Sequence, residues 1–431
     1  MERRFLVAGV DIGSGQVCCA IGSCDCDSRK SEILGVAKVA CEEIESGSID
    51  TIPRSADTIK MALKTALESA EKKSDVQGVV IQSVIVAVRG SKIQFHNLHG
   101  KSINNNSELE IGEDHIKTAL EDAEYKIKIE QNHDILQKIP SRYIIDGQRK
   151  KYPVGLFGRD IEVSLSAVTI PNSDNRNMQK AMQQAMQQAS FLYSDNKYVY
   201  GYWSVSDVIL TKEEKDLSCL LVDIGGSTIG LVNYVDGTIK NSDEIPDGSD
   251  KISRDIQKYF KISAETARKI KEEHGAAFVS SDLKDAEFSF VAANGKTFKR
   301  TRFELIDNVI RPKVDIILQE IANVIETKKY GDSFLTGGIV LTGGGSKLNS
   351  IVEAFEAAFK CSVRLGYLSA SPTLDAPHDV MADMSYTTAI GAVAGYFCDN
   401  SISDCRYVPN SGRLAASDII ASFFKKIKEL F

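Results

Sequence analysis

At 431 residues and 47.2 kDa, the chain is about three times as long as a typical domain, which predicts more than one domain. Its 43% hydrophobic and 26% charged residues are typical of a folded globular protein and argue against an extended disordered chain. The 59 acidic residues outnumber the 52 basic ones and give a net charge of −7, so no general positive field would attract a nucleic acid.

The chain begins with three short apolar strands, expected at residues 5–10, 17–21 and 33–39, followed by a helix at 55–73 and a buried strand at 79–88. The same order recurs in the second half. There, strands are expected at 219–223, 229–234, 238–245 and 338–341, with a helix near 249–260. The repeated order predicts a degenerate duplication.

A segment between the two halves interrupts this pattern. It carries a strand at 84–88, a polar loop, a helix near 113–128 and strands around 143–145 and 161–170. We therefore interpret residues 84–168 as an inserted small domain.

Two short motifs repeat with the duplication. VAGVDIGSGQ places Asp11 at the end of an apolar strand, and LLVDIGGST places Asp223 in the same position, each followed by glycine and hydroxyl residues. One such turn is common in hairpins, because Asp and Gly suit tight turns. Two copies in matching strand contexts favour a shared ligand.

These turns contain the parts that a nucleoside triphosphate needs. Backbone N–H groups hold phosphates, small residues allow close approach, and carboxylates hold a hydrated divalent cation. The expected phosphate contacts are Gly13, Ser14, Gly15 and Gln16 in the first turn and Gly225, Gly226, Ser227 and Thr228 in the second. Asp11 and Asp223 are the expected contacts of Mg²⁺ through water. Two hairpins facing across a cleft would hold one ligand from both sides.

A third motif, GIVLTGGGS, runs from a strand into a glycine-rich turn and then into a helix expected at 347–359. Its glycines would let a flat base or ribose lie against the backbone, and a helix N-terminus favours negative charge. The expected contacts are Gly343, Gly344, Gly345 and Ser346. The alternative is an ordinary turn that joins a strand to a helix.

The order of DIGSG, inserted domain, VDIGGST and IVLTGGGS resembles the actin, Hsp70 and sugar-kinase superfamily, and within it the FtsA family of bacterial cell division proteins. The resemblance covers essentially the whole chain, including IPSRYIID and YPVGLFG in the insert. It implies an actin-like α/β fold: two ribonuclease-H-like lobes around a nucleotide cleft, an inserted small α+β domain and a C-terminal amphipathic helix. It also implies ATP and Mg²⁺ as cofactors, and assembly of the chain with itself into actin-like protofilaments. The implied location is the cytoplasmic face of the cell membrane at the division septum, with FtsZ and other divisome proteins as partners.

The resemblance also suggests domain bounds. The core of lobe 1 is expected at 1–83, 169–212 and 369–398, around the insert at 84–168. The core of lobe 2 is expected at 213–245 and 304–368, with a small subdomain at 246–303. A linker at 399–412 and a membrane-targeting helix at 413–431 complete the chain.

Several positions depart from the family pattern. Gln16 stands where these proteins often carry a lysine, Ser227 replaces the third glycine of the second motif, and Gly230 replaces its last aspartate. We therefore expect at most a weak ATPase, and the sequence identifies no catalytic residue. Lys271 is kept as an expected ribose contact, although Arg268 stands where the family usually has a glutamate.

A cluster of six cations lies within 18 positions of this acidic chain: Lys296, Lys299, Arg300, Arg302, Arg311 and Lys313. Such a run is ordinarily a solvated face. The resemblance implies instead that this region receives the C-terminal peptide of FtsZ, with Lys299, Arg300, Arg302 and Lys313 as contacts.

The last 19 residues have the spacing of an amphipathic helix. The expected membrane contacts are the apolar Ile419, Ile420, Phe423, Phe424, Ile427, Leu430 and Phe431 and the basic Lys425, Lys426 and Lys428. Phenylalanines flanked by lysines suit an anionic membrane surface, and no stretch of the chain is apolar for the length that spans a bilayer. The alternative is a terminal helix docked on its own protein.

Two other interpretations stay open. One is a catalytic member of the superfamily, either an Hsp70-like ATPase or a small-molecule kinase. A kinase would need a catalytic aspartate facing a substrate cleft, and the sequence offers no candidate beyond the two phosphate-turn aspartates. The other is a pilus-assembly actin homologue, which shares the insert but does not require a lipid-binding tail.

Overall fold

The chain folds into two compact units in the computed structural model. Unit 1 comprises Met1–Ile209, Thr238–Ser242 and Leu368–Phe431, and unit 2 comprises Leu210–Gly237 and Asp243–Tyr367. The structure describes residues 5–25, 30–41, 43–45, 47–73, 81–105, 110–127, 132–189, 195–280, 284–292, 294–332, 334–368 and 374–399.

The core of unit 1 is a six-stranded mixed sheet in the order β11-β6-β1-β2-β3-β19. Its strands are β1 (Phe5–Ile12), β2 (Gln16–Asp25), β3 (Lys30–Ala40), β6 (Ile81–Val88), β11 (Asp195–Tyr200) and β19 (Leu374–Asp375). The first three strands pair antiparallel, whereas β6 runs parallel to both β1 and β11. The prediction that residues 84–88 belong to the inserted domain is wrong, because β6 pairs with β1 on one edge and with β11 on the other, inside the core sheet.

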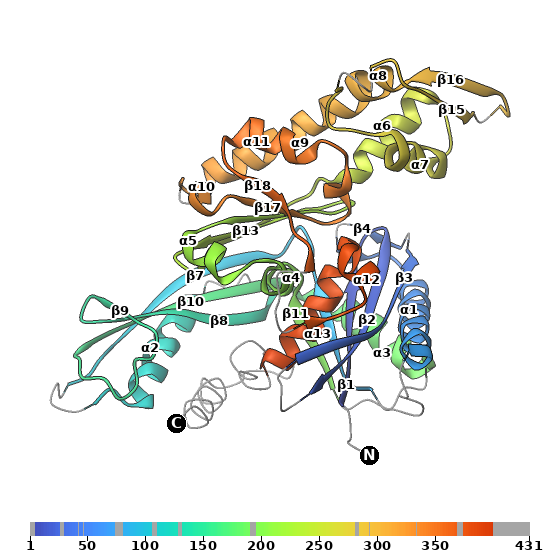
Figure 1. Cartoon of the computed structure of the whole chain (residues 1–431). Coiled ribbons are helices and arrows are strands. Elements are labelled where there is room, and N and C mark those ends of the chain that lie inside the picture. Colours follow the sequence, from blue (N-terminus) through green and yellow to red (C-terminus); the bar gives the residue numbers. More distant parts are fainter. Residues whose placement is uncertain are drawn as a thin grey trace. The chain divides into compact units, whose positions relative to one another are not determined.

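Helices cover both faces of this sheet (Figure 1). α1 (Ile52–Lys73) packs on β2 and β3 and against α3 (Asn172–Ala189), while α13 (Thr387–Asp399) packs on β1 and against α4 (Gly201–Ile209). Gly35 allows the close approach of α1, since a Cβ there would lie 2.3 Å from the Ala66 carbonyl oxygen. Unit 1 is completed by the small hairpin of β4 (Ile44–Glu45) and β5 (Ser48–Ile49) and by the short α12 (His378–Ala382).

The inserted domain has its own four-stranded sheet, in the order β7-β10-β8-β9. Its elements are β7 (Gln94–Ile103), α2 (Glu113–Tyr125), β8 (His133–Ile145), β9 (Gln148–Lys150) and β10 (Asp160–Pro171). Alternate residues of β10 point to a core that the apolar face of α2 completes. The insert therefore begins after β6 and returns to the core of unit 1 at the end of β10.

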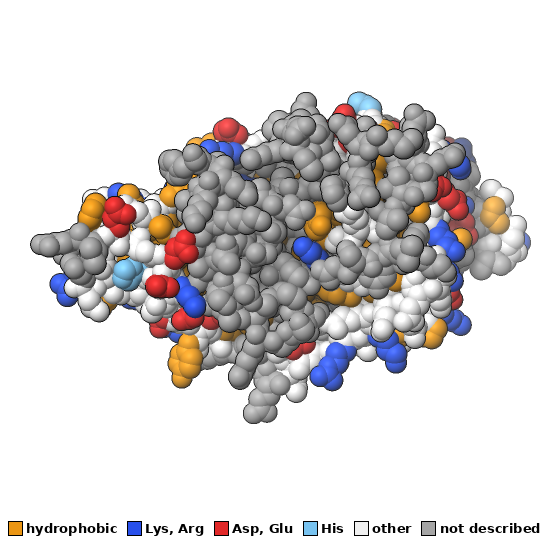
Figure 2. Space-filling view, turned by 90° about the horizontal axis from the view of Figure 1, so that it is seen from below, with side chains coloured by type: hydrophobic (Ala, Val, Ile, Leu, Met, Phe, Trp, Pro, Cys, Tyr) orange, Lys and Arg blue, Asp and Glu red, His pale blue; other side chains and the backbone are white. Residues whose placement is uncertain are grey.

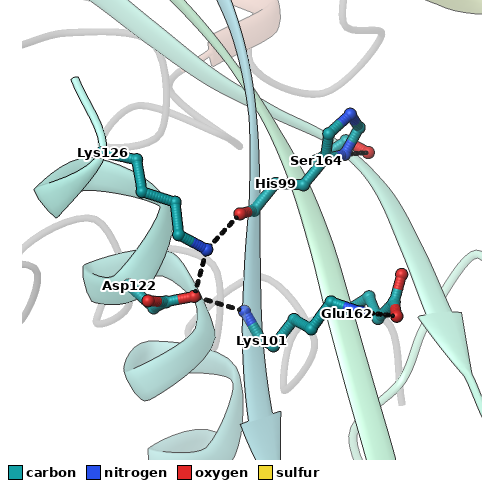
Figure 3. A network of polar contacts seen from close by, with 6 residues as sticks. All are labelled: His99, Lys101, Asp122, Lys126, Glu162 and Ser164. Atoms are coloured by element: carbon teal, nitrogen blue, oxygen red, sulfur yellow. Dashed lines mark hydrogen bonds and ion pairs between the residues drawn. The ribbon is translucent and has the colours of Figure 1, made fainter. Parts of the chain in front are cut away.

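Polar contacts hold α2 against the edge of this sheet (Figure 3). Asp122 accepts hydrogen bonds from the Lys101 amide at 2.9 Å and from Lys126 at 2.7 Å, and Lys126 also donates to the His99 carbonyl at 2.8 Å. On the neighbouring strand, Glu162 pairs with the Lys101 ammonium. These exposed contacts fix the register of the helix, while the apolar core supplies most of the stability.

A second sheet, which belongs to unit 2 except for Thr238–Ser242 of β14, repeats the arrangement with five strands in the order β14-β13-β12-β17-β18. The strands are β12 (Leu220–Ile224), β13 (Ile229–Val235), β14 (Thr238–Ile245), β17 (Ile339–Thr342) and β18 (Val363–Leu365). As in unit 1, the first strand pairs antiparallel with the second and parallel with the fourth. The shared strand order confirms the duplication that the sequence predicts.

The remaining elements of unit 2 pack on this sheet or extend from it. They are α5 (Lys212–Leu217), α6 (Ser249–Phe260), α7 (Ala264–His274), β15 (Glu287–Val291), β16 (Thr297–Thr301), α8 (Arg302–Leu305), a π-helical turn at Ile306–Ile310, α9 (Arg311–Thr327), α10 (Phe334–Gly337) and α11 (Ile351–Phe359). The hairpin of β15 and β16 is anchored by Phe288 and Phe290, which pack against Phe260 of α6.

Acidic and basic side chains mix on the surface. On the face drawn in Figure 2, the described Lys and Arg side chains lie interspersed with Asp and Glu side chains. Interspersed charge of this kind produces no strong field of one sign over the described part of that face.

Candidate functional site

The first predicted phosphate turn, residues 13–16, joins β1 to β2 in unit 1. Ile12 pairs with Val17 across the hairpin, and the Gly13 amide donates to the Gln16 carbonyl oxygen at 3.1 Å. At the tip, a Cβ on Gly15 would meet no described heavy atom within 4 Å. The glycine there leaves the backbone open to close approach by a ligand.

Asp11 lies at the carboxyl end of β1, buried beside the turn. Arg89, which directly follows β6, donates from one guanidinium nitrogen to both carboxylate oxygens of Asp11, at 2.6 and 2.7 Å. Burial raises the pKa of the Asp11 carboxyl, while Arg89 and a hydrogen bond with Thr388 act to lower it. The sequence analysis did not identify Arg89. The only signal for it is a cation at the end of an apolar strand, and its place beside Asp11 depends on β6 pairing with β1.

The second phosphate turn has the same geometry in unit 2. Ile224 pairs with Ile229, and the Gly225 amide donates to the Thr228 carbonyl oxygen at 2.9 Å. Asp223 ends its strand as Asp11 does and is 1% exposed. The two sequence motifs therefore have the same local backbone structure.

The N-terminus of α6 is fastened to the second turn. The amides of Ser249 and Asp250 donate to the carbonyl oxygens of Gly225 and Gly226, at 3.0 and 2.9 Å. Lys271 of α7 donates to the Ser249 carbonyl oxygen at 3.2 Å, which places it beside the same helix end. Burial lowers the pKa of Lys271, and the Asp250 carboxylate acts in the opposite direction.

The third motif lies directly beside Asp223. Thr342 is the register partner of Asp223 on β17, and a Cβ on Gly343 would lie 2.2 Å from the Asp223 carboxylate. Gly343 also has a φ of 83°, which favours glycine, and Ser346 closes the turn by donating to the Gly343 carbonyl oxygen at 2.6 Å. A Cβ on Gly344 would meet no described heavy atom within 4 Å.

The helix after this motif starts later than predicted. Residues Gly344–Lys347 form a 3₁₀ turn, and α11 begins only at Ile351, after Ser350 in a left-handed conformation with a φ of 61°. The expectation of a helix from residue 347 is therefore wrong, and the N-terminus of the α-helix does not follow the glycines directly. The amides of Ser346 and Leu348 close this turn by donating to the carbonyl oxygens of Gly343 and Gly345, at 3.2 and 3.3 Å, and Gly345 packs closely against Ile224.

Unit 2 therefore gathers the predicted residues around Asp223: Gly225, Gly226, Ser227, Thr228, Lys271, Gly343, Gly344, Gly345 and Ser346. Small residues, open backbone and a buried carboxylate suit phosphate groups and a hydrated cation. Within the described ranges, no three His, Cys, Asp or Glu side chains come together to hold a metal ion. Mg²⁺ at such a site would depend on water and phosphate oxygens for most of its ligands.

The predicted peptide contacts lie mainly on the β15–β16 hairpin. Lys299 is exposed and pairs with Glu287 on the opposite strand. The Arg300 guanidinium lies over the Phe298 ring at 5.6 Å, and Arg302 donates to the His274 carbonyl oxygen at 2.9 Å. Arg300 thus lies beside an aromatic ring, whereas Lys299, the preceding residue of the strand, points to the opposite face of the hairpin.

Lys313 does not belong with the predicted peptide contacts. Its side chain is 9% exposed, and its ammonium donates to the Asp247 carboxylate at 2.5 Å. It lies on the buried face of α9, together with Val314 and Ile317. The prediction that Lys313 contacts a peptide is wrong, since its charge is used inside unit 2.

The predicted linker at 399–412 and membrane helix at 413–431 lie outside the described residues, apart from Asp399 at the end of α13. In the described part of the chain, every helix is too short or too polar to cross a lipid bilayer.

Two family models match the chain. "Cell division protein FtsA" matches residues 220–391, and "SHS2 domain inserted in FTSA" matches residues 90–169. The chain is 28% identical over 401 residues to the cell division protein FtsA of Buchnera aphidicola, covering 90% of each chain. It is 26% identical over 395 residues to that of Escherichia coli K12, covering 90% of this chain and 89% of the relative.

Solved structures share the fold at low sequence identity. A chain of the PilM–PilN type IV pilus biogenesis complex aligns with a TM-score of 0.58 at 13% identity, covering 90% of this chain and 97% of that one. MreB5 of Spiroplasma citri bound to ADP aligns with a TM-score of 0.52 at 12% identity, covering 91% and 96%. The shared arrangement extends over nearly the whole length of each protein.

Proposed function

The chain belongs to the FtsA family of cell division proteins and has an actin-like fold, and we propose that it binds ATP with Mg²⁺, polymerises, and tethers FtsZ to the cytoplasmic membrane at the division site. The observation that carries the nucleotide part is the gathering of two separate motifs, residues 223–228 and 343–346, around Asp223 in unit 2. These motifs lie more than 100 residues apart in the sequence, yet the Gly343 backbone lies directly against the Asp223 carboxylate.

Each part of this half-site has a distinct task in the proposal. The turn at 225–228 and the open glycine backbone near Gly344 bind phosphate oxygens, and Asp223 orients the waters of Mg²⁺. Lys271 contributes its ammonium beside the N-terminus of α6, where the helix dipole also favours negative charge. The first turn at 13–16 supplies a second set of backbone contacts.

ATP hydrolysis is proposed to be weak at most. Gly230 is the register partner of Asp223 on β13 and brings no side chain to this position. The binding of ATP, rather than its rapid hydrolysis, would then control assembly.

A pilus-assembly role and a kinase role have no observation in their favour. The likeness to the PilM–PilN chain lies at 13% identity and concerns the fold alone. In unit 2, the described residues place two carboxylates beside the turn at 225–228, Asp223 and Asp250, and both lie at the proposed phosphate and cation contacts.

Replacing Asp223 tests the proposed site. We expect Asp223→Ala to weaken Mg-ATP binding by about tenfold or more, because one metal contact is lost. Titration calorimetry with ATP and Mg²⁺ measures this directly. Asp332→Ala is the matched control, because Asp332 lies exposed in a loop of the same unit. Equal affinity of Asp223→Ala and the unchanged protein would refute the assigned site.

A further inference from the structure

The two halves of the duplication differ at one place beside the aspartates. Asp11 is in register with Ala87 on β6, and Asp223 is in register with Thr342 on β17. In unit 2 the chain continues past Thr342 into glycines, so bare backbone faces the carboxylate of Asp223. In unit 1 the chain continues past Ala87 to Arg89, whose side chain covers the carboxylate of Asp11.

Arg89 is held along its whole length. Its Cγ packs on Gly201, where a Cβ would lie only 2.8 Å away, and its guanidinium lies over the Tyr202 ring at 5.8 Å. The side chain of Arg89 is 15% exposed, and the side chain of Asp11 is 7% exposed. A Cβ on Gly13 would lie 3.3 Å from the same guanidinium nitrogen, so this cation directly adjoins the phosphate turn.

The charges of the first turn require such a partner. Asp11 is the one charged residue in the segment from 11 to 16, because Gln16 is neutral. An uncompensated carboxylate beside a triphosphate would repel it, and the repulsion is strong where water is excluded. A buried ion pair cancels that charge. Removal of one partner leaves the other as a buried charge whose desolvation is no longer compensated.

Resting on the proposed nucleotide binding, we propose that Arg89 is a positioning residue that neutralises Asp11 at the first phosphate turn, so that Asp11 is not a contact of the divalent cation. The two aspartates then have different tasks despite their matching motifs. Asp11 holds Arg89, and Arg89 makes the first turn acceptable to an anionic ligand.

The test measures Mg-ATP affinity and thermal stability in the full chain for four variants. R89Q leaves the carboxylate uncompensated and should weaken binding about tenfold or more. D11N leaves Arg89 as an uncompensated cation and should tighten binding by about threefold or more. The double variant R89Q/D11N is neutral at this place and should recover most of the affinity lost in R89Q. K92Q is the charge-matched control, because Lys92 is exposed three positions further along.

The outcomes separate this inference from the proposed function. Unchanged affinity in R89Q, or a double variant as weak as R89Q, would overturn the neutralising role. D11N is read independently of R89Q, so the test stands even if R89Q does not fold. Weaker binding in D11N, with a higher Mg²⁺ requirement, would show that Asp11 holds the metal and would also overturn it. If the unchanged protein fails to bind ATP, the proposed function itself is wrong.

Discussion

Lys313 and Arg311 lie two positions apart on α9, and their removal should lower the stability of the protein by different amounts. Lys313→Ala removes the closest cation from the carboxylate of Asp247, which is 1% exposed and keeps Lys251 at 3.2 Å, and we expect a loss of about 1–3 kcal/mol in the free energy of unfolding. Arg311→Ala removes an exposed ion pair with Asp307 and should cost less than about 1 kcal/mol. Urea denaturation of both variants measures the difference. Equal midpoints would contradict the structural role of Lys313.

The same pair should make stability depend on pH. Burial acts to raise the pKa of Asp247, but hydrogen bonds from Lys313, the Gly248 amide and Lys251 prevail and lower it. A carboxyl whose pKa is lower in the folded state stabilises the protein above its ordinary pKa of about 4, and this stability is lost as the pH falls below that value. The difference between the unchanged protein and Lys313→Ala should therefore shrink in acid. A constant difference from pH 7 to pH 3 would exclude this linkage.

The β15–β16 hairpin is the element on which the proposed FtsZ contact depends. Arg300 lies beside Phe298 on one face of β16 and Lys299 lies exposed on the other face, so an acidic peptide with apolar residues would meet charge on either face and a ring on one. We expect the double reversal Lys299→Glu with Arg300→Glu to weaken binding of the FtsZ C-terminal peptide by at least about tenfold, measured by fluorescence anisotropy. Lys258→Glu on α6 is the control, since that lysine is exposed outside the hairpin. Undiminished binding by the double variant would remove the hairpin from the proposed contact.

The elements show which parts of the fold the sequence could predict. The strands β1, β2, β12 and β13 and the helix α1 were predictable, because their apolar periodicity and Asp-Gly turns are local signals. The later start of α11 was not, because the left-handed Ser350 and the packing of Gly345 on Ile224 are tertiary effects. Arg89 and Lys313 were missed or misplaced for the same reason, since each meets an aspartate more than 60 residues away.

At the scale of the whole molecule, the proposal joins weak membrane attachment to assembly. One amphipathic helix binds lipid only marginally, whereas several helices in one polymer act together and gain about 10² to 10⁴ in avidity. In the last 19 residues, Arg413 and three lysines outnumber Asp418 and Glu429, in a chain whose net charge is −7. Attachment to an anionic surface would therefore depend on this segment and on polymerisation.

Cosedimentation with lipid vesicles tests both dependences together. We expect the intact chain to pellet with vesicles that contain anionic lipid, and to pellet more strongly when Mg-ATP is present, because subunits assembled in one polymer present many helices at once. A chain that ends at Gly412 should remain in the supernatant in either condition, and vesicles of neutral lipid should retain less of the intact chain. Equal pelleting of the two chains would disprove the membrane role of residues 413–431. If the intact chain instead pellets equally with and without Mg-ATP, lipid attachment does not depend on the nucleotide. Some other factor would then regulate assembly.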